Sequence, residues 1–108
     1  MTCITNVIVT TAIQDGAWEK SDHGSMDVLN DYLYKHYQGT TLHDIYMQAG
    51  GRKPLSCDVF VAAVDYLDID AFIELFHTVP WEKPQEVQLM IRTEGEVRFK
   101  IYTPKISA

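Results

Sequence analysis

The feature that most constrains this chain is a pair of alternating segments near its C-terminus. Residues 87–92 and 97–102 each place an apolar side chain at every second position, which is the period of a half-buried strand. Residues 93–95, Thr-Glu-Gly, suit a three-residue hairpin loop with glycine in the left-handed conformation. That register sets Arg92 opposite Glu96, a favourable cross-strand pair. It also gathers four apolar side chains on one face: Ile91, Val97, Leu89 and Phe99.

Two further segments have the composition of strands. Residues 4–11 are β-branched almost throughout, which favours a strand. Residues 57–66 carry a continuous apolar run, which predicts a strand that is central in the sheet or covered on both faces. Residues 41–47 form another strand candidate. Residues 12–24, with Trp18 among them, are polar and glycine-containing, so they predict a long loop.

Apolar residues at helical spacing mark two helices. The first, over residues 26–38, has Ser25 as its expected N-cap and Gly39 as its stop. Its apolar stripe consists of Met26, Val28, Leu29, Tyr32, Leu33 and Tyr37. The second, over residues 69–79, has Asp68 as its expected cap and ends before Pro80. Its stripe consists of Ile69, Phe72, Ile73 and Phe76.

The order of elements is strand, helix, strand, strand, helix, strand, strand. We therefore expect an α+β fold in which the first six elements form a ferredoxin-like βαββαβ sheet. The first and third strands would be central, both helices would cover one face, and the fifth strand would extend the sheet beyond the fourth as part of the C-terminal hairpin. A chain of 108 residues has the size of one domain, spanning residues 1–108.

The net charge of −6 argues against duplex DNA or an anionic membrane as the main partner, because both need a basic face. Acidity is compatible with a basic protein partner and equally with solubility alone. The chain has two cysteines, Cys3 and Cys57, which is too few for a disulfide framework. No apolar segment reaches membrane-spanning length, and the N-terminus lacks signal-peptide features. We therefore expect a cytoplasmic protein.

The sequence Gly50-Gly51-Arg52-Lys53 is a local concentration of positive charge. Exposed amides beside two cations can hold a phosphate or a carboxylate. Its spacing differs from that of a Walker A loop. The alternative is a plain turn with charged residues.

The residue types that carry chemistry form no recognisable catalytic or metal-binding pattern. Asp65, Asp68 and Asp70 cluster, but helix capping explains the last two. The histidines lack metal-ligand spacing, and Cys57 lies at the start of an apolar strand, where a thiol usually packs as a small hydrophobe. We expect no catalytic residues, no metal and no cofactor.

A sheet with helices on one face leaves its other face open to water or to a partner. The predicted partner surface consists of Met90, Arg92, Arg98, Lys100 and Tyr102, with Trp81 either beside it or at the edge of the core. Cations and aromatic residues are enriched at interfaces, and methionine adapts to irregular ones. The alternative is an amphipathic face that stays wet.

These observations favour a small non-enzymatic protein that binds another macromolecule, of the inhibitor, immunity or regulatory type. Self-association into a homodimer is one form of such binding. Two alternatives stay open. One is a sensor or sequestering protein that holds an anionic ligand at Gly51, Arg52 and Lys53. The other is an enzyme that uses Asp65 or His23 in a site completed across a dimer.

Overall fold

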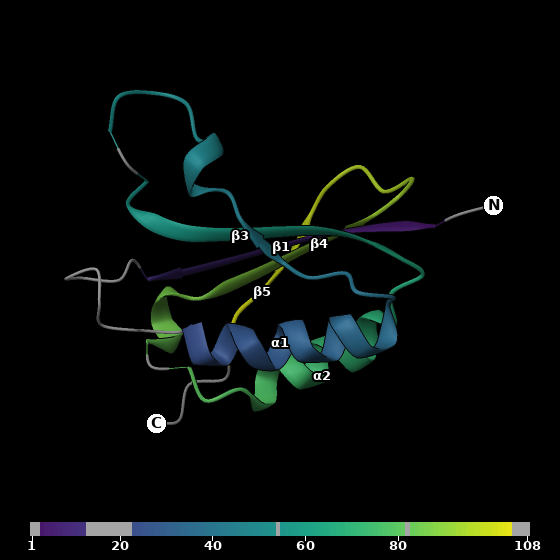
Figure 1. Cartoon of the computed structure of the whole chain (residues 1–108). Helices are drawn as coiled ribbons and strands as arrows, with labels where there is room; N and C mark the ends of the chain where they lie inside the picture. The colour runs from purple at the N-terminus through teal and green to yellow at the C-terminus, as the bar shows by residue number, and fades with distance from the viewer. Residues whose placement is uncertain (1–2, 13–22, 54, 82, 105–108) are drawn as a thin grey trace.

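The computed structural model describes residues 3–12, 23–53, 55–81 and 83–104. It is an α+β structure in which two α-helices lie on the same side of a five-stranded antiparallel sheet (Figure 1). The elements are β1 (Ile4–Ala12), α1 (His23–His36), β2 (His43–Asp44), η1 (Tyr46–Gln48), β3 (Cys57–Asp65), α2 (Ile69–Thr78), η2 (Pro84–Glu86), β4 (Gln88–Thr93) and β5 (Lys100–Tyr102). No helix in these ranges is long and apolar enough to cross a membrane. The loop predicted for residues 12–24 falls largely outside the described residues.

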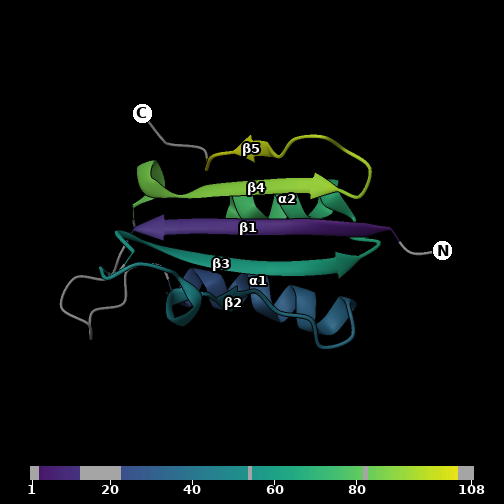
Figure 2. The same ribbon diagram turned by 90° about the horizontal axis from the view of Figure 1, so that it is seen from above.

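Strand β1 is the centre of the sheet, whose strand order is β2-β3-β1-β4-β5 (Figure 2). Its whole length pairs with β3, from Ile4 opposite Asp65 to Ala12 opposite Cys57. Its other edge pairs with β4, from Thr5 opposite Thr93 onward. The first segment of the chain is therefore held by two segments that come much later.

The side of the sheet that faces the helices forms the hydrophobic core. Alternate residues of β1 point into it, and Val7 and Val9 are at most 1% exposed. Four helical side chains that meet them have no exposed surface: Leu29, Leu33, Phe72 and Phe76. The rings of Tyr32 in α1 and Phe72 in α2 lie 6.2 Å apart and join the two helices. The apolar stripes read from the sequence are the faces that pack, except for Val28, which is 42% exposed.

The ends of the helices agree in part with the prediction. Asp68 caps α2, because its Oδ1 accepts a hydrogen bond of 3.1 Å from the N–H of Ala71. Helix α1, however, begins at His23, so the expected cap Ser25 lies inside it. It ends at His36 rather than at residue 38, because Gln38 adopts φ of 52° and Gly39 adopts φ of 81°, which stop the helix.

Strand β2 is much shorter than residues 41–47, the range expected for it. Only His43 and Asp44 pair with β3. The chain then turns into η1, and the N–H of Gln48 donates to the carbonyl oxygen of Ile45. The β2 edge of the sheet is consequently only two residues long.

The C-terminal hairpin forms, but the predicted register is wrong. Glu96 is used in closing the turn: its N–H donates to the carbonyl oxygen of Thr93, and its Oε1 accepts from the N–H of Thr93 at 2.8 Å. Pairing resumes only at Lys100, which lies opposite Ile91 in the place expected for Val97, a shift of three residues. An odd shift exchanges the two faces of a strand.

The consequence is that β5 presents different side chains from those expected. Ile101 lies opposite Met90 on the open face, whereas Tyr102 lies opposite Leu89 and packs against the core. Arg92 and Glu96 are in contact, but not as the predicted cross-strand pair: the N–H at Nε of Arg92 donates to the carbonyl oxygen of Glu96, at 2.7 Å.

We predict that Phe72→Ala lowers the free energy of unfolding by about 3–5 kcal/mol, because a fully buried ring leaves a cavity. Glu74→Ala, at an exposed position of the same helix, should change it by less than about 0.5 kcal/mol. Chemical denaturation followed by circular dichroism measures both. Similar values for the two variants would contradict the placement of α2 against the sheet.

Candidate functional site

The open face of the sheet carries an apolar row that crosses all five strands. The pairings put one residue from each strand side by side: His43, Val61, Ile8, Met90 and Ile101. Four of these five side chains are apolar, and Ile101 is 60% exposed. The described helices lie on the opposite side (Figure 1), so within the described residues nothing covers this row.

The face is also hollow. A depression of about 570 Å³ lies over β1 and β3, and three residues of the apolar row line it: Ile8, His43 and Val61. The residues that line it include Asn6, Ile8, Val61 and Ala63 from the two central strands, and His43, Arg92 and Phe99 at its sides. Asn6 is fixed there, because its Nδ2 donates to the carbonyl oxygen of Arg92 at 3.1 Å. The lining from the two central strands is therefore mostly apolar, with Asn6 as its polar member, and His43 and Arg92 lie at the sides.

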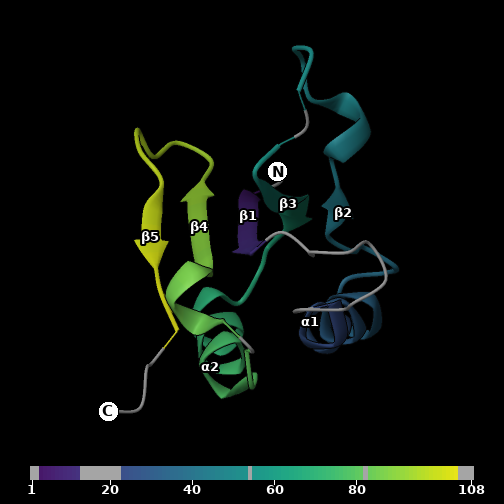
Figure 3. The same ribbon diagram turned by 90° about the vertical axis from the view of Figure 1, so that its left-hand side faces the viewer.

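Two segments rise beside this hollow on the open side of the sheet (Figure 3). The first comprises residues 45–53 of the β2–β3 connection. The second is the β4–β5 loop, residues 94–99. Each carries a highly exposed apolar side chain: Met47 is 83% exposed in the first, and Val97 is 87% exposed in the second. Large exposed apolar groups that gather on one face are typical of binding surfaces.

The predicted partner surface is only partly on this face. Met90 and Arg92 lie on it, half-buried, and Arg98 is exposed in the β4–β5 loop. Lys100 and Tyr102 belong to the helix side of β5. The sequence did not single out Ile8, Val61 or Ile101, which form the apolar row. A signal for Val61 was present, because residues 59–64 are apolar at consecutive positions and one side of a strand is enough to face the core.

Trp81 is a core residue rather than a surface anchor. It is 8% exposed, and its ring lies 5.4 Å from that of Phe76. Its indole N–H donates to the carbonyl oxygen of Phe76 at 3.2 Å. Trp81 therefore packs against the core just beyond the end of α2.

The predicted anion site, Gly50-Gly51-Arg52-Lys53, is an exposed turn at the tip of the β2–β3 connection. A Cβ atom added at Gly50 or Gly51 would meet nothing within 4 Å. The turn is therefore open to solvent around both glycines. Gly51 does need its flexibility, since its φ is 99°.

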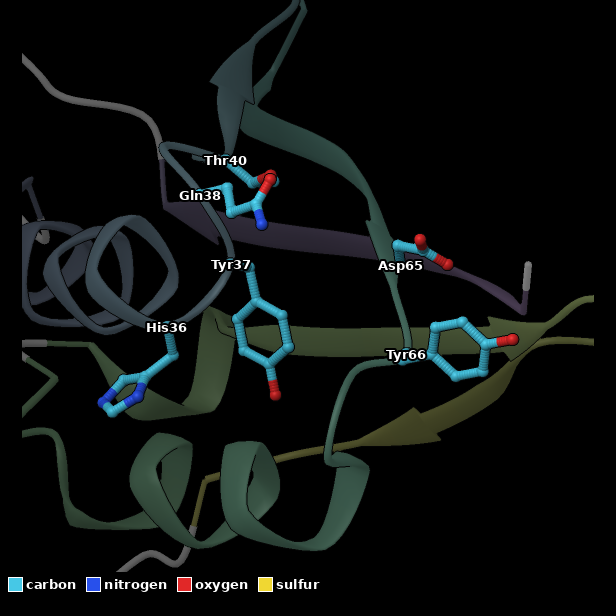
Figure 4. Close-up of a pocket in the computed structure, with 6 residues that line it drawn as sticks. All are labelled: His36, Tyr37, Gln38, Thr40, Asp65 and Tyr66. Carbon is cyan, nitrogen blue, oxygen red and sulfur yellow. The ribbon is translucent and has the colours of Figure 1, made fainter. Parts of the chain in front are cut away.

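A second pocket, of about 460 Å³, lies where the segment after α1 meets the end of β3 (Figure 4). Its lining is polar: His36, Tyr37, Gln38, Thr40, Asp65 and Tyr66. The hydroxyl oxygen of Tyr37 accepts a hydrogen bond of 2.9 Å from the N–H of Asp68, and Asp65 accepts one of 3.3 Å from the N–H of Cys3. The first bond joins the segment after α1 to the residue that caps α2, and the second joins the start of β1 to the end of β3.

Two residues of this pocket have left-handed backbones without being glycine. They are Gln38, with φ of 52°, and Tyr66, with φ of 56°, and such a conformation is uncommon for large side chains. Nearby, burial raises the pKa of Tyr32, with further contributions from Tyr37 and Asp68. That shift keeps the phenol protonated and belongs to the contact between the helices.

The remaining reactive groups are dispersed. Within the described ranges, no three histidine, cysteine, aspartate or glutamate side chains lie close enough to hold a metal ion. Cys3 and Cys57 are both free and half-buried. His77 has a buried Nδ1 without a hydrogen-bond partner. The side chain of His23 lies outside what the structure describes.

Comparisons of the chain with family models, with curated proteins and with solved structures give no match. The site is therefore interpreted from its own geometry.

The turn that shapes the β4–β5 loop should depend on pH. The hydrogen bond from the N–H of Thr93 lowers the pKa of Glu96, and Lys100, whose Nζ lies 3.6 Å from Oε2, adds to this. A lowered pKa means that the ionised carboxylate stabilises the folded state at neutral pH and that this stability is lost as pH falls.

We predict that Glu96→Gln lowers the melting temperature at pH 7 and that its difference from wild type shrinks below about pH 4, where carboxyl groups become protonated. Thermal unfolding at several pH values measures this. Glu86→Gln, at an exposed position of η2, is the matched control. A deficit of the same size at pH 3 and pH 7 would show that the charge of Glu96 has no such role.

Proposed function

We propose that this chain is a non-enzymatic binding protein that engages another macromolecule through the open face of its sheet. One observation carries the proposal: an apolar row and an apolar hollow lie together on a face that the described helices leave uncovered. Burying such a surface is favourable by about 25 cal/mol for each Å² of apolar area.

The size of the face is compatible with a macromolecule as the occupant. The five strands, of two to nine residues each, make a face of roughly 460 Å² at a rise of about 3.3 Å per residue and a spacing of about 4.8 Å. Stable protein interfaces bury about 800 Å² on each partner. The strands therefore supply more than half of the area that one partner contributes to an ordinary interface, and the flanking segments 45–53 and 94–99 would add to it.

We also propose the ferredoxin-like assignment for the fold. Its support is the order of elements β1-α1-β2-β3-α2-β4, together with the central positions of β1 and β3 in the sheet. Strand β5 would then be an addition at the β4 edge.

We propose a cytoplasmic location because both cysteines, Cys3 and Cys57, are free thiols. The register puts Cys57 opposite Ala12 at one end of β1, while Cys3 adjoins the other end. A strand of nine residues separates them by about 30 Å, far beyond the reach of a disulfide bond. Two unpaired cysteines are typical of a reducing compartment.

A small molecule is a second candidate occupant of the same face. The hollow of about 570 Å³ falls within the range of ligand sites. Arg92 at its side would suit a ligand with an apolar body and a carboxylate. A capture experiment that detects both proteins and small molecules separates the two candidates.

The proposal predicts that charges placed in the apolar row abolish binding. Tagged wild type and the double variant Met90→Glu with Ile101→Glu would be used to capture proteins from a lysate of the source cell, with mass spectrometry of proteins and of small molecules. The control is Val28→Glu with Tyr34→Glu, at positions of α1 that are 42% and 62% exposed. We expect wild type and control to capture the same protein and the double variant to lose it.

Equal capture by all three proteins would show that the open face is not the interface. A small molecule retained by wild type and control alone would favour the second candidate. Circular dichroism of each variant checks that it is folded.

A further inference from the structure

The charged side chains of the described chain are divided unequally between its two sides. The helices and the residue that caps α2 carry six exposed carboxylates, which are Asp27, Asp31, Asp68, Asp70, Glu74 and Glu86. Two exposed cations, Lys35 and Lys83, accompany them. The helix side is therefore acidic, as the whole chain is.

The open side of the sheet carries cations without carboxylate partners. They are Arg92 at the side of the hollow, Arg98 in the β4–β5 loop, and Arg52 and Lys53 at the tip of the β2–β3 connection. Among the described residues, none of these four lies within ion-pair distance of a carboxylate, whereas Lys100 lies 3.6 Å from Glu96. The two raised segments lie at diagonally opposite corners of the sheet (Figure 2), so cations flank the apolar row on both sides.

The carboxylates of the open side are already bonded within the chain. Glu94 accepts a hydrogen bond of 3.0 Å from the N–H of Ile4, and Asp65 accepts one of 3.3 Å from the N–H of Cys3. Glu96 is held by the backbone of its own turn and by its lysine partner. Among the described residues this side has five cations and three carboxylates, a balance of 5 − 3 = +2, in a chain whose net charge is −6.

Arg92 joins this positive charge to the apolar surface. It is half-buried and lines the hollow together with Ile8 and Val61. Its Nε donates to the carbonyl oxygen of Glu96, which holds the guanidinium group in place and leaves its other four N–H donors for a ligand. A guanidinium group binds a carboxylate through two parallel hydrogen bonds. The hollow therefore suits an apolar group that has a carboxylate beside it.

The apolar row extends well beyond the hollow. His43, Val61 and Ile8 line the hollow, whereas Met90 and Ile101 continue the row across β4 and β5. With strands about 4.8 Å apart, the row is about 19 Å long. That is the length of about six residues of extended chain or about thirteen residues of α-helix. An occupant that covers the whole row is therefore elongated, as a segment of a protein is.

We propose that the partner of the open face is an acidic protein that docks an amphipathic segment across the strands of the sheet. The inference rests on the proposed function of the open face and names the chemistry of the macromolecule that it binds. Apolar side chains of the segment fill the hollow and cover the row, and one of its carboxylates binds Arg92. Further carboxylates face Arg98 on one flank and Arg52 and Lys53 on the other.

A single-stranded nucleic acid is a poorer match for the same cations. Its bases bind by stacking on aromatic rings, whereas four members of the apolar row are aliphatic. Phe99, at the side of the hollow, is the aromatic residue that lines it among the described residues. Aliphatic surface gains more from burial under the apolar side chains of a protein.

The first experiment selects ligands for immobilised wild type from a phage-displayed library of random peptides of about 16 residues, long enough to span the row. We expect the enriched peptides to combine apolar residues with a net negative charge. Non-specific attraction to a chain of net charge −6 would enrich basic peptides instead. Acidic sequences would therefore report a specific site.

The second experiment measures the affinity of the enriched peptides for charge-reversed variants by fluorescence anisotropy. Arg52→Glu with Lys53→Glu should raise the dissociation constant about tenfold or more, because both flanking cations become repulsive. Lys35→Glu with Lys83→Glu makes the same change of charge on the helix side and is the matched control. Its effect should stay within about threefold at physiological salt. All four positions are exposed, so the variants should fold.

The third experiment uses the same assay on the hollow and the row. Arg92→Gln should weaken binding about tenfold or more, and Arg92→Lys should restore only part of it, because lysine keeps the charge and loses the paired hydrogen bonds. Met90→Glu with Ile101→Glu should abolish binding. Thermal unfolding of each variant checks that it is folded.

The outcomes separate this inference from the proposed function. If no peptide is enriched on wild type above the level on Met90→Glu with Ile101→Glu, the inference is overturned, and the capture experiment decides the proposed function alone. Enriched peptides that are basic or uncharged also overturn it, and so do acidic peptides that bind the two charge-reversed pairs equally. Tighter binding of a random pool of single-stranded oligonucleotides, with the same dependence on the cations, would assign the site to nucleic acid and overturn it as well.

Discussion

The pairing of β1 with β3 on one side and β4 on the other is the interaction on which the rest of the structure depends. It fixes which side chains of the three central strands point the same way. Val7, Phe60, Leu89 and their neighbours then form one surface, and two helices are enough to cover it. A chain of this size has no further described helix with which to cover the other surface.

Because no described helix covers the open face, its apolar side chains need another explanation. In an antiparallel sheet with one wet side, the residues on that side are usually polar. Here Ile8, Val61 and Met90 occupy the middle of it. Their presence is explained if another surface covers them, as the proposed function requires. The raised corners fit the same explanation, because Met47 and Val97 extend the apolar area outward where a flat wet sheet would need none.

The sequence predicted the elements better than their ends and their register. The stripes of α1 and α2 and the β-branched composition of β1 follow from local periodicity, which tertiary packing then reinforces. The register of β5 does not follow from periodicity, because it depends on Glu96 closing the turn with both its backbone and its carboxylate. The open face was predicted as a partner surface. Because the register of β5 differs from the prediction, Ile101 lies on this face in place of Lys100 and Tyr102. Local pattern does not decide between core and surface for Trp81, because its place depends on a contact with Phe76.

The central place of β1 also has a consequence for how the chain folds during synthesis. Strand β1 leaves the ribosome before both of the segments with which it pairs, residues 57–65 and residues 88–93. Contacts of such long range slow folding, because the intervening chain must be ordered before they form. The three central strands therefore cannot all pair until residues 88–93 have been synthesised, and until β3 and β4 are available β1 is an unpaired, β-branched segment of the kind that chaperones protect.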